Sequence, residues 1–134
     1  MRLSRLSAVS GYLLALMLVC APGFSSAADA NRQYRVRATS KVDSCAALNR
    51  AVAAAKKEDD WRALYGFSLY TMGYLSALNR VAFDTYDIAG KANSKTILVW
   101  LQNYCAEHPE DSFDSALVQM SAEFYPNRYA AKPR

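Results

Sequence analysis

The sequence has few of the residues from which enzyme active sites are built. His108 is the only histidine, and no histidine and aspartate set is placed to activate a serine. The acidic residues between Glu107 and Asp114 crowd one turn and the start of a helix, where acidic side chains are favoured electrostatically. No glycine-rich phosphate loop follows a strand. We therefore predict no catalytic residues, no cofactor and no enzymatic activity.

Positive charge is too dispersed for a nucleic-acid-binding surface. The chain has 16 lysine and arginine residues against 12 acidic residues, and the basic ones gather near its two ends. Binding of DNA or RNA requires basic residues concentrated on one folded face. We predict no nucleic-acid partner. We interpret residues 29–41 as a flexible basic segment and residues 127–134 as a flexible tail.

Long apolar runs are scarce, with one exception at the start of the chain. Two arginines precede an uncharged stretch over residues 6–24, and small residues follow up to Ala28. This order is typical of a secretory signal peptide. Its apolar core is too short, and too interrupted by glycine and proline, for a stable membrane span. We predict a signal peptide over residues 1–28, cleavage after Ala28 with Ala30 as the alternative, a periplasmic location and no stable membrane anchor.

Cleavage would leave two cysteines, Cys45 and Cys105. An even number of cysteines in an exported protein predicts a disulfide, with two separate buried thiols as the alternative. Such a bridge would stabilise the fold by roughly 4 kcal/mol in the chain-entropy model. Two cysteines and His108 cannot fill a four-ligand metal site, so we predict no metal ligands.

Helical periodicity dominates the rest of the chain. Apolar residues recur at three- and four-residue intervals in four segments, and no run alternates as a strand would. The segments lie near residues 42–55, 62–83, 94–105 and 113–124, each preceded by a polar residue that could cap a helix. We predict an all-α domain of four helices over residues 42–126, with a disulfide that joins the first helix to the third.

Two glycines interrupt the second predicted helix. Gly66 and Gly73 weaken it by about 1 kcal/mol each relative to alanine. They are seven residues apart and therefore share a face, which we interpret as a site where a neighbouring helix approaches closely.

Aromatic residues are plentiful. The chain has nine tyrosines and two tryptophans, more than a small domain can bury completely. Partly exposed aromatic side chains favour a protein-binding face. The candidate binding residues, which include one from the acidic turn, are Trp61, Tyr70, Tyr74, Trp100, Tyr104 and Asp111.

One segment carries a resemblance to a known family. Residues 72–79 (MGYLSALN), followed 26 residues later by Cys105, resemble the central helix and second cysteine of the HdeA/HdeB acid-stress chaperones. The resemblance extends over about residues 45–124. Those chaperones are small exported all-α proteins with one disulfide that bind unfolding proteins in an acidified periplasm. The resemblance implies a chaperone role in acid or envelope stress, with unfolding client proteins as partners. Apart from the resemblance, a second copy of the chain is a further candidate partner.

A second resemblance points to a different partner. Residues 107–110 (EHPE) and 115–118 (SALV) are similar to the second half of periplasmic immunity proteins of the Rap/Tai type. Those proteins neutralise peptidoglycan-cutting toxins by direct binding. The alternative function is therefore an immunity or inhibitor protein for one toxin or envelope enzyme. This alternative requires a folded surface at neutral pH, whereas the chaperone hypothesis requires release of apolar surface in acid.

Overall fold

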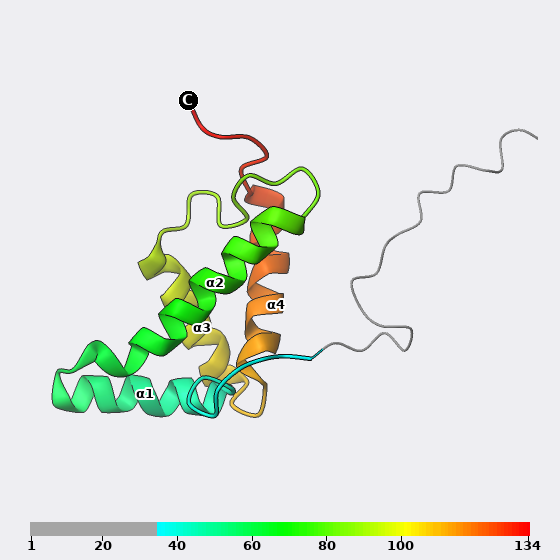
Figure 1. The fold of residues 1–134 in the computed structure, drawn as a ribbon. Helices are drawn as coiled ribbons and strands as arrows, with labels where there is room; N and C mark the ends of the chain where they lie inside the picture. Colours follow the sequence, from blue (N-terminus) through cyan, green and yellow to red (C-terminus); the bar gives the residue numbers. More distant parts are fainter. Residues whose placement is uncertain (1–34) are drawn as a thin grey trace, which may run out of the picture. The chain divides into compact units, whose positions relative to one another are not determined.

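The computed structural model describes residues 35–134, and the signal peptide expected over residues 1–28 lies outside them. The described part is all-α, as predicted: its ordered elements are helices, and β-pairing is confined to two isolated bridges. No helix in this part is long and apolar enough to cross a membrane. The elements in Figure 1 are α1 (Cys45–Glu58), the 3-10 helix η1 (Trp61–Leu64), α2 (Tyr65–Val81), α3 (Ser94–Glu107), α4 (Phe113–Phe124) and the 3-10 helix η2 (Tyr125–Asn127).

Polar side chains at the expected places begin these helices. Ser44 caps α1, Asn93 caps α3 and Ser112 caps α4, each accepting a hydrogen bond from a backbone N–H three residues later. The start of α2 differs from the prediction. Asp60 caps the preceding η1 instead, where its carboxylate accepts the backbone N–H of Arg62 at 3.0 Å. The second helical segment therefore begins as a 3-10 turn and becomes α-helical only at Tyr65.

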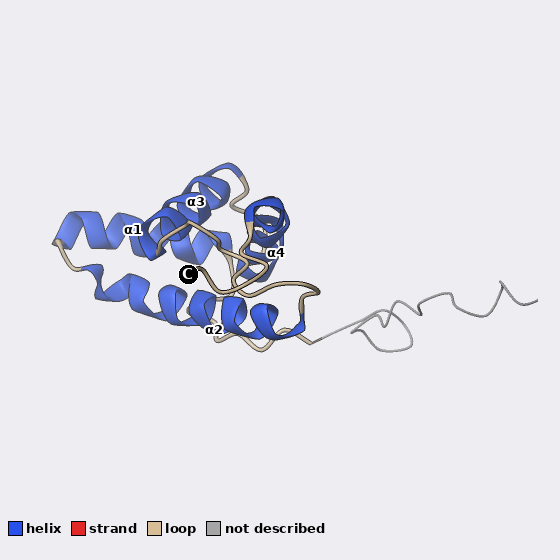
Figure 2. Cartoon of the chain, turned by 90° about the horizontal axis from the view of Figure 1, so that it is seen from above, coloured by secondary structure: helices blue, strands red, loops and turns tan. Residues whose placement is uncertain are grey.

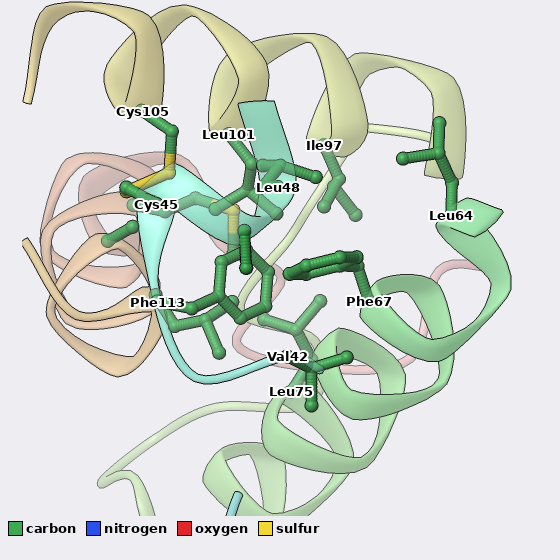
Figure 3. Packing of buried hydrophobic residues seen from close by; sticks show 14 of the residues in the cluster. Val42, Cys45, Leu48, Leu64, Phe67, Leu75, Ile97, Leu101, Cys105 and Phe113 are labelled. Atoms are coloured by element: carbon green, nitrogen blue, oxygen red, sulfur yellow. A yellow bond between two sulfur atoms is a disulfide. The ribbon is translucent and has the colours of Figure 1, made fainter. Parts of the chain in front are cut away.

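The predicted disulfide is present in the buried core. Cys45 and Cys105, with an S–S distance of 2.00 Å, join the first turn of α1 to the last turns of α3 (Figure 3). Both cysteines are fully buried. Phe67 of α2 meets Phe113 of α4 edge to face, with ring centroids 5.0 Å apart. The core thus consists of a covalently joined α1–α3 pair, against which α2 and α4 pack through apolar side chains.

Helix α2 lies on the outside of the domain. Figure 2 shows it along one side, with α1, α3 and α4 on its other side. Its buried residues Phe67, Thr71 and Leu75 recur at intervals of four and therefore share one face. That face points into the core, and the opposite face of α2 is left without another helix on it.

The chain after α4 remains tied to the domain further than predicted. Arg128 donates from Nε to the carbonyl oxygen of Asp84 at 3.0 Å, and Tyr129 exchanges backbone hydrogen bonds with Asp87 at 2.9 and 3.0 Å. Arg128 and Tyr129, which lie within the tail predicted from residue 127, are therefore bonded to the domain. Most of these bonds involve backbone atoms, which side-chain patterns do not reveal.

Candidate functional site

Helix α2 is unusual for a helix on a protein surface. The sequence between Arg62 and Arg80 contains no charged side chain. A surface helix of a globular domain normally carries an apolar face towards the core and a charged or polar face towards solvent. Because α2 has an apolar core-facing side and no charged side, its solvent face is suited to contact something other than water.

The solvent side of α2 carries a continuous set of apolar side chains. Tyr65, Leu69 and Met72 have exposed fractions of 66%, 57% and 37%, and their spacing of four and three residues places them on one face. Gly73 and Ser76 are exposed beside them. We call these five residues the α2 outer face. Exposed apolar side chains of this size on an uncharged helix depart from an ordinary solvated surface.

The surroundings of Gly73 differ from the expectation that a neighbouring helix approaches closely there. No heavy atom of the described residues lies within 4 Å of the position that a Cβ of Gly73 would take, so no neighbouring helix approaches there. At Gly66 the close neighbour is the Cγ1 atom of Val42, in the segment before α1, 3.1 Å from the added Cβ. Glycine in a helix costs about 1 kcal/mol relative to alanine. At Gly73 no packing inside the described domain offsets this cost.

The predicted binding residues are not gathered at one place. Trp61 is exposed in η1, one turn before the α2 outer face. Tyr70 and Tyr74 are half-buried and pack against the core, with the ring of Tyr70 6.1 Å from that of Phe113. Trp100 and Tyr104 pack against the core from α3. Of the six candidates, Trp61 is thus the one that is largely accessible to a partner.

The α3 aromatics form a stack that closes the turn between α3 and α4. The rings of Trp100 and Tyr104 lie 5.3 Å apart and nearly parallel, and His108 follows 4.6 Å from Tyr104. The Tyr104 hydroxyl donates to the Asp111 carboxylate at 2.6 Å, and this hydrogen bond raises the pKa of Tyr104. The carbonyl oxygen of Asp111 also accepts the N–H of Cys45 at 3.0 Å. Asp111 therefore holds the turn beside the disulfide, which gives it a structural role.

The electrostatics at the start of α2 are set by one ion pair. Arg62 donates to both carboxylate oxygens of Asp60, at 2.6 to 3.0 Å. These hydrogen bonds lower the pKa of Asp60 to about 2. The Asp60 carboxylate therefore keeps its charge, and its cap on η1, in acid where an ordinary carboxyl group is protonated.

The described residues bury few polar side chains. Their buried polar side chains are Thr71 and Ser121, and each donates its hydroxyl hydrogen to a carbonyl of its own helix, at 2.8 and 2.7 Å. Within residues 35–134 no group of three histidine, cysteine, aspartate or glutamate side chains could hold a metal ion.

Several exposed apolar residues were not among the predicted candidates. Besides the α2 outer face, Val81 and Phe83 at the end of α2 have exposed fractions of 79% and 86%. The uncharged run of α2 was a signal readable in the sequence. The sequence did not show which apolar residues of α2 face solvent, because helical periodicity alone cannot orient a helix that is apolar on several sides.

Comparison with protein-family models, with curated proteins and with solved structures finds no match to this chain. The HdeA/HdeB and Rap/Tai resemblances therefore remain predictions from short motifs.

Proposed function

We propose that this protein is a periplasmic protein-binding domain that acts as a chaperone in acid or envelope stress, and that the α2 outer face contacts its clients. The observation that carries the proposal is the exposure of Tyr65, Leu69 and Met72 on a helix without charge between Arg62 and Arg80. Contiguous exposed apolar side chains on a small domain typically mark a site of interaction.

Acid would enlarge this surface. Protonation of carboxylates removes negative charge from a chain with 12 acidic and 16 basic residues, and the resulting repulsion loosens non-covalent contacts. The disulfide keeps α1 and α3 joined, whereas α2 is held by packing. Loosening of α2 would expose Phe67 and Leu75 in addition to the α2 outer face. Unfolding clients would then meet apolar surface on both sides of one helix.

The test is suppression of the aggregation of a client protein at about pH 3, below the usual carboxyl pKa, and at pH 7. We expect protection mainly in acid, and reduced protection by the double variant Leu69→Ser with Met72→Ser. Val99→Ser is the matched control, because Val99 of α3 has an exposed fraction of 46% and lies outside the α2 outer face. Absence of protection in acid by a soluble wild-type protein would exclude the chaperone function.

A second candidate function is supported by the loop after α2. Val81 and Phe83 are exposed, and the backbone beside them is held by two hydrogen bonds. The Tyr125 hydroxyl donates to the carbonyl oxygen of Phe83 at 3.3 Å, and Arg128 donates to the carbonyl oxygen of Asp84. Rigid apolar anchors bind a folded partner at low entropic cost. This geometry suits an immunity or inhibitor protein that binds one envelope enzyme or toxin at neutral pH.

Pull-downs from envelope extract at pH 7 and at about pH 3 separate the two functions. Phe83→Ala is the informative variant, because the side chain is exposed and its loss leaves the core intact. Trp100 and Asp111 are less suitable, since both pack against or bond to the fold. Loss of one stoichiometric partner in Phe83→Ala would favour the immunity function. Several weak partners that appear only in acid would favour the chaperone.

A further inference from the structure

A cavity of about 370 Å³ lies at the opposite end of the domain from the disulfide, between the α2–α3 loop, the first turn of α3 and the end of α4. Figure 1 shows this loop running past the C-terminal end of α4. Sites for small molecules typically measure about 300–1,000 Å³, so the cavity is large enough for a small ligand. Its lining residues are Ala89, Lys91, Ala92, Thr96, Phe124 and Asn127.

The walls of the cavity are fixed by contacts distant in sequence. Asn79 of α2 accepts the N–H of Ile88 at 2.8 Å, and the Ile88 side chain is buried. Gly90 has a φ of 56° and its backbone lies against the carbonyl oxygen of Asn127 so closely that a side chain at Gly90 would clash. The backbone pairing of Asp87 with Tyr129 also holds this loop against the segment that follows α4. A cavity with walls held in this way exists before a ligand arrives, which lowers the entropic cost of binding.

The lining combines an apolar interior with one charge. Ala89, Ala92 and Phe124 supply the apolar surface, and Phe124 is backed by the edge-on ring of Trp100 at 6.3 Å. Of the described residues that line the cavity, Lys91 is the only charged one, and it is exposed to solvent. An ammonium group forms charge-assisted hydrogen bonds to a carboxylate. The cavity is therefore complementary to a molecule with an apolar body and an anionic end.

We propose that this cavity binds a small carboxylic acid with an apolar chain, whose hydrocarbon part lies against Ala92 and Phe124 and whose carboxylate meets Lys91. The site is separate from the α2 outer face and does not depend on the function proposed for that face. It would make the domain a carrier or sensor of medium-chain acids.

Octanoate and 1-octanol are the probes, because both have an eight-carbon chain and only octanoate carries a charge. Each is titrated into the full domain, labelled with nitrogen-15, and the backbone amide shifts are followed. We expect both to shift the amides of Ala92, Thr96 and Asn127, with octanoate binding more tightly. Lys91→Gln should weaken octanoate about threefold, as for an exposed ion pair, and leave 1-octanol unchanged.

A second pair of variants tests whether the hydrocarbon chain of the ligand lies in the cavity. Ala92→Leu fills the cavity and should abolish the shifts caused by both probes, whereas Ala122→Leu, on the exposed side of α4, should leave them unchanged. Shifts at Leu69 and Met72 in place of the cavity amides would overturn the proposal, as would the absence of any shift. If Ala92→Leu disturbs folding, Lys91→Gln still decides, since equal weakening of both probes would refute the role of the charge.

Discussion

The disulfide-linked pair α1–α3 and the helix α2 are stabilised in different ways and present different surfaces. Cys45 and Cys105 join the pair covalently, and charged side chains such as Lys56 and Lys95 are exposed on it. Helix α2 is held by the packing of residues such as Phe67, and its outer face is uncharged and apolar. The covalently fixed part of the domain thus has the ordinary solvated surface, and the part held by packing carries the candidate binding surface.

This difference indicates which part can respond to conditions. Local opening of a helix is least costly where the helix makes few contacts. The covalent link between α1 and α3 keeps these two helices together during such opening. Release of α2 from the disulfide-linked pair would expose its buried face, including Phe67 and Leu75, without unfolding the whole chain. This difference between the α1–α3 pair and α2 is tested by changing each of them separately and measuring stability and binding.

Removal of the disulfide should have the largest effect. The double variant Cys45→Ser with Cys105→Ser should lose about 4 kcal/mol of unfolding free energy, because the unfolded chain is no longer closed into a loop. Urea denaturation at pH 7, compared with the oxidised wild type, measures this loss. A loss below about 1 kcal/mol would mean that packing and not the disulfide holds α1 to α3.

Truncation at the contact between α2 and α4 should have the next largest effect. Phe67→Ala removes a buried ring from its edge-on contact with Phe113 and should cost about 3 kcal/mol. Hydrogen exchange provides a regional measurement, in which protection should fall more in α2 than in α1 and α3. Equal loss of protection in all helices would contradict the view that α2 opens separately.

Substitution of the two glycines should separate stability from binding. Gly73→Ala should raise the unfolding free energy by about 1 kcal/mol, because the added Cβ meets no described atom. The same variant should reduce client protection if partners approach the backbone there. Gly66→Ala is the matched control, and its gain should be smaller because its Cβ lies 3.1 Å from Val42 Cγ1. Higher protection by Gly73→Ala would argue against close approach at this face.

The smallest effect concerns the cap before α2. The carboxyl carbon resonance of Asp60 should titrate with a pKa of about 2, and Arg62→Ala should return this pKa towards the usual value near 4. Since the folded pKa is lowered, the contribution of the pair to stability is present above about pH 4 and disappears as the pH falls through about 2. The contribution is small, because the pair is exposed to solvent. A normal Asp60 pKa in the wild type would show that the pair does not persist in solution.

Much of the fold could be predicted because its determinants are local. Ser44, Asn93 and Ser112 act as caps through hydrogen bonds to N–H groups three residues away, and the periodicity of apolar side chains marks the buried faces. The change from a 3-10 turn to an α-helix at Tyr65 was missed, since it depends on how the chain leaves α1 and not on helix propensity. The accessibility of the binding candidates could not be predicted, because aromatic identity does not tell which rings pack inwards.

The sequence by itself determined the four helices, the caps of α1, α3 and α4, the pairing of the two cysteines and the uncharged character of α2. All of these depend on short-range patterns or on simple counts. The tertiary structure decided which side of α2 faces solvent, where Gly73 lies, and how residues near Arg128 hold the α2–α3 loop and shape the cavity. These features arise from contacts between residues far apart in the chain. Their energies depend on mutual packing geometry, which no local pattern specifies.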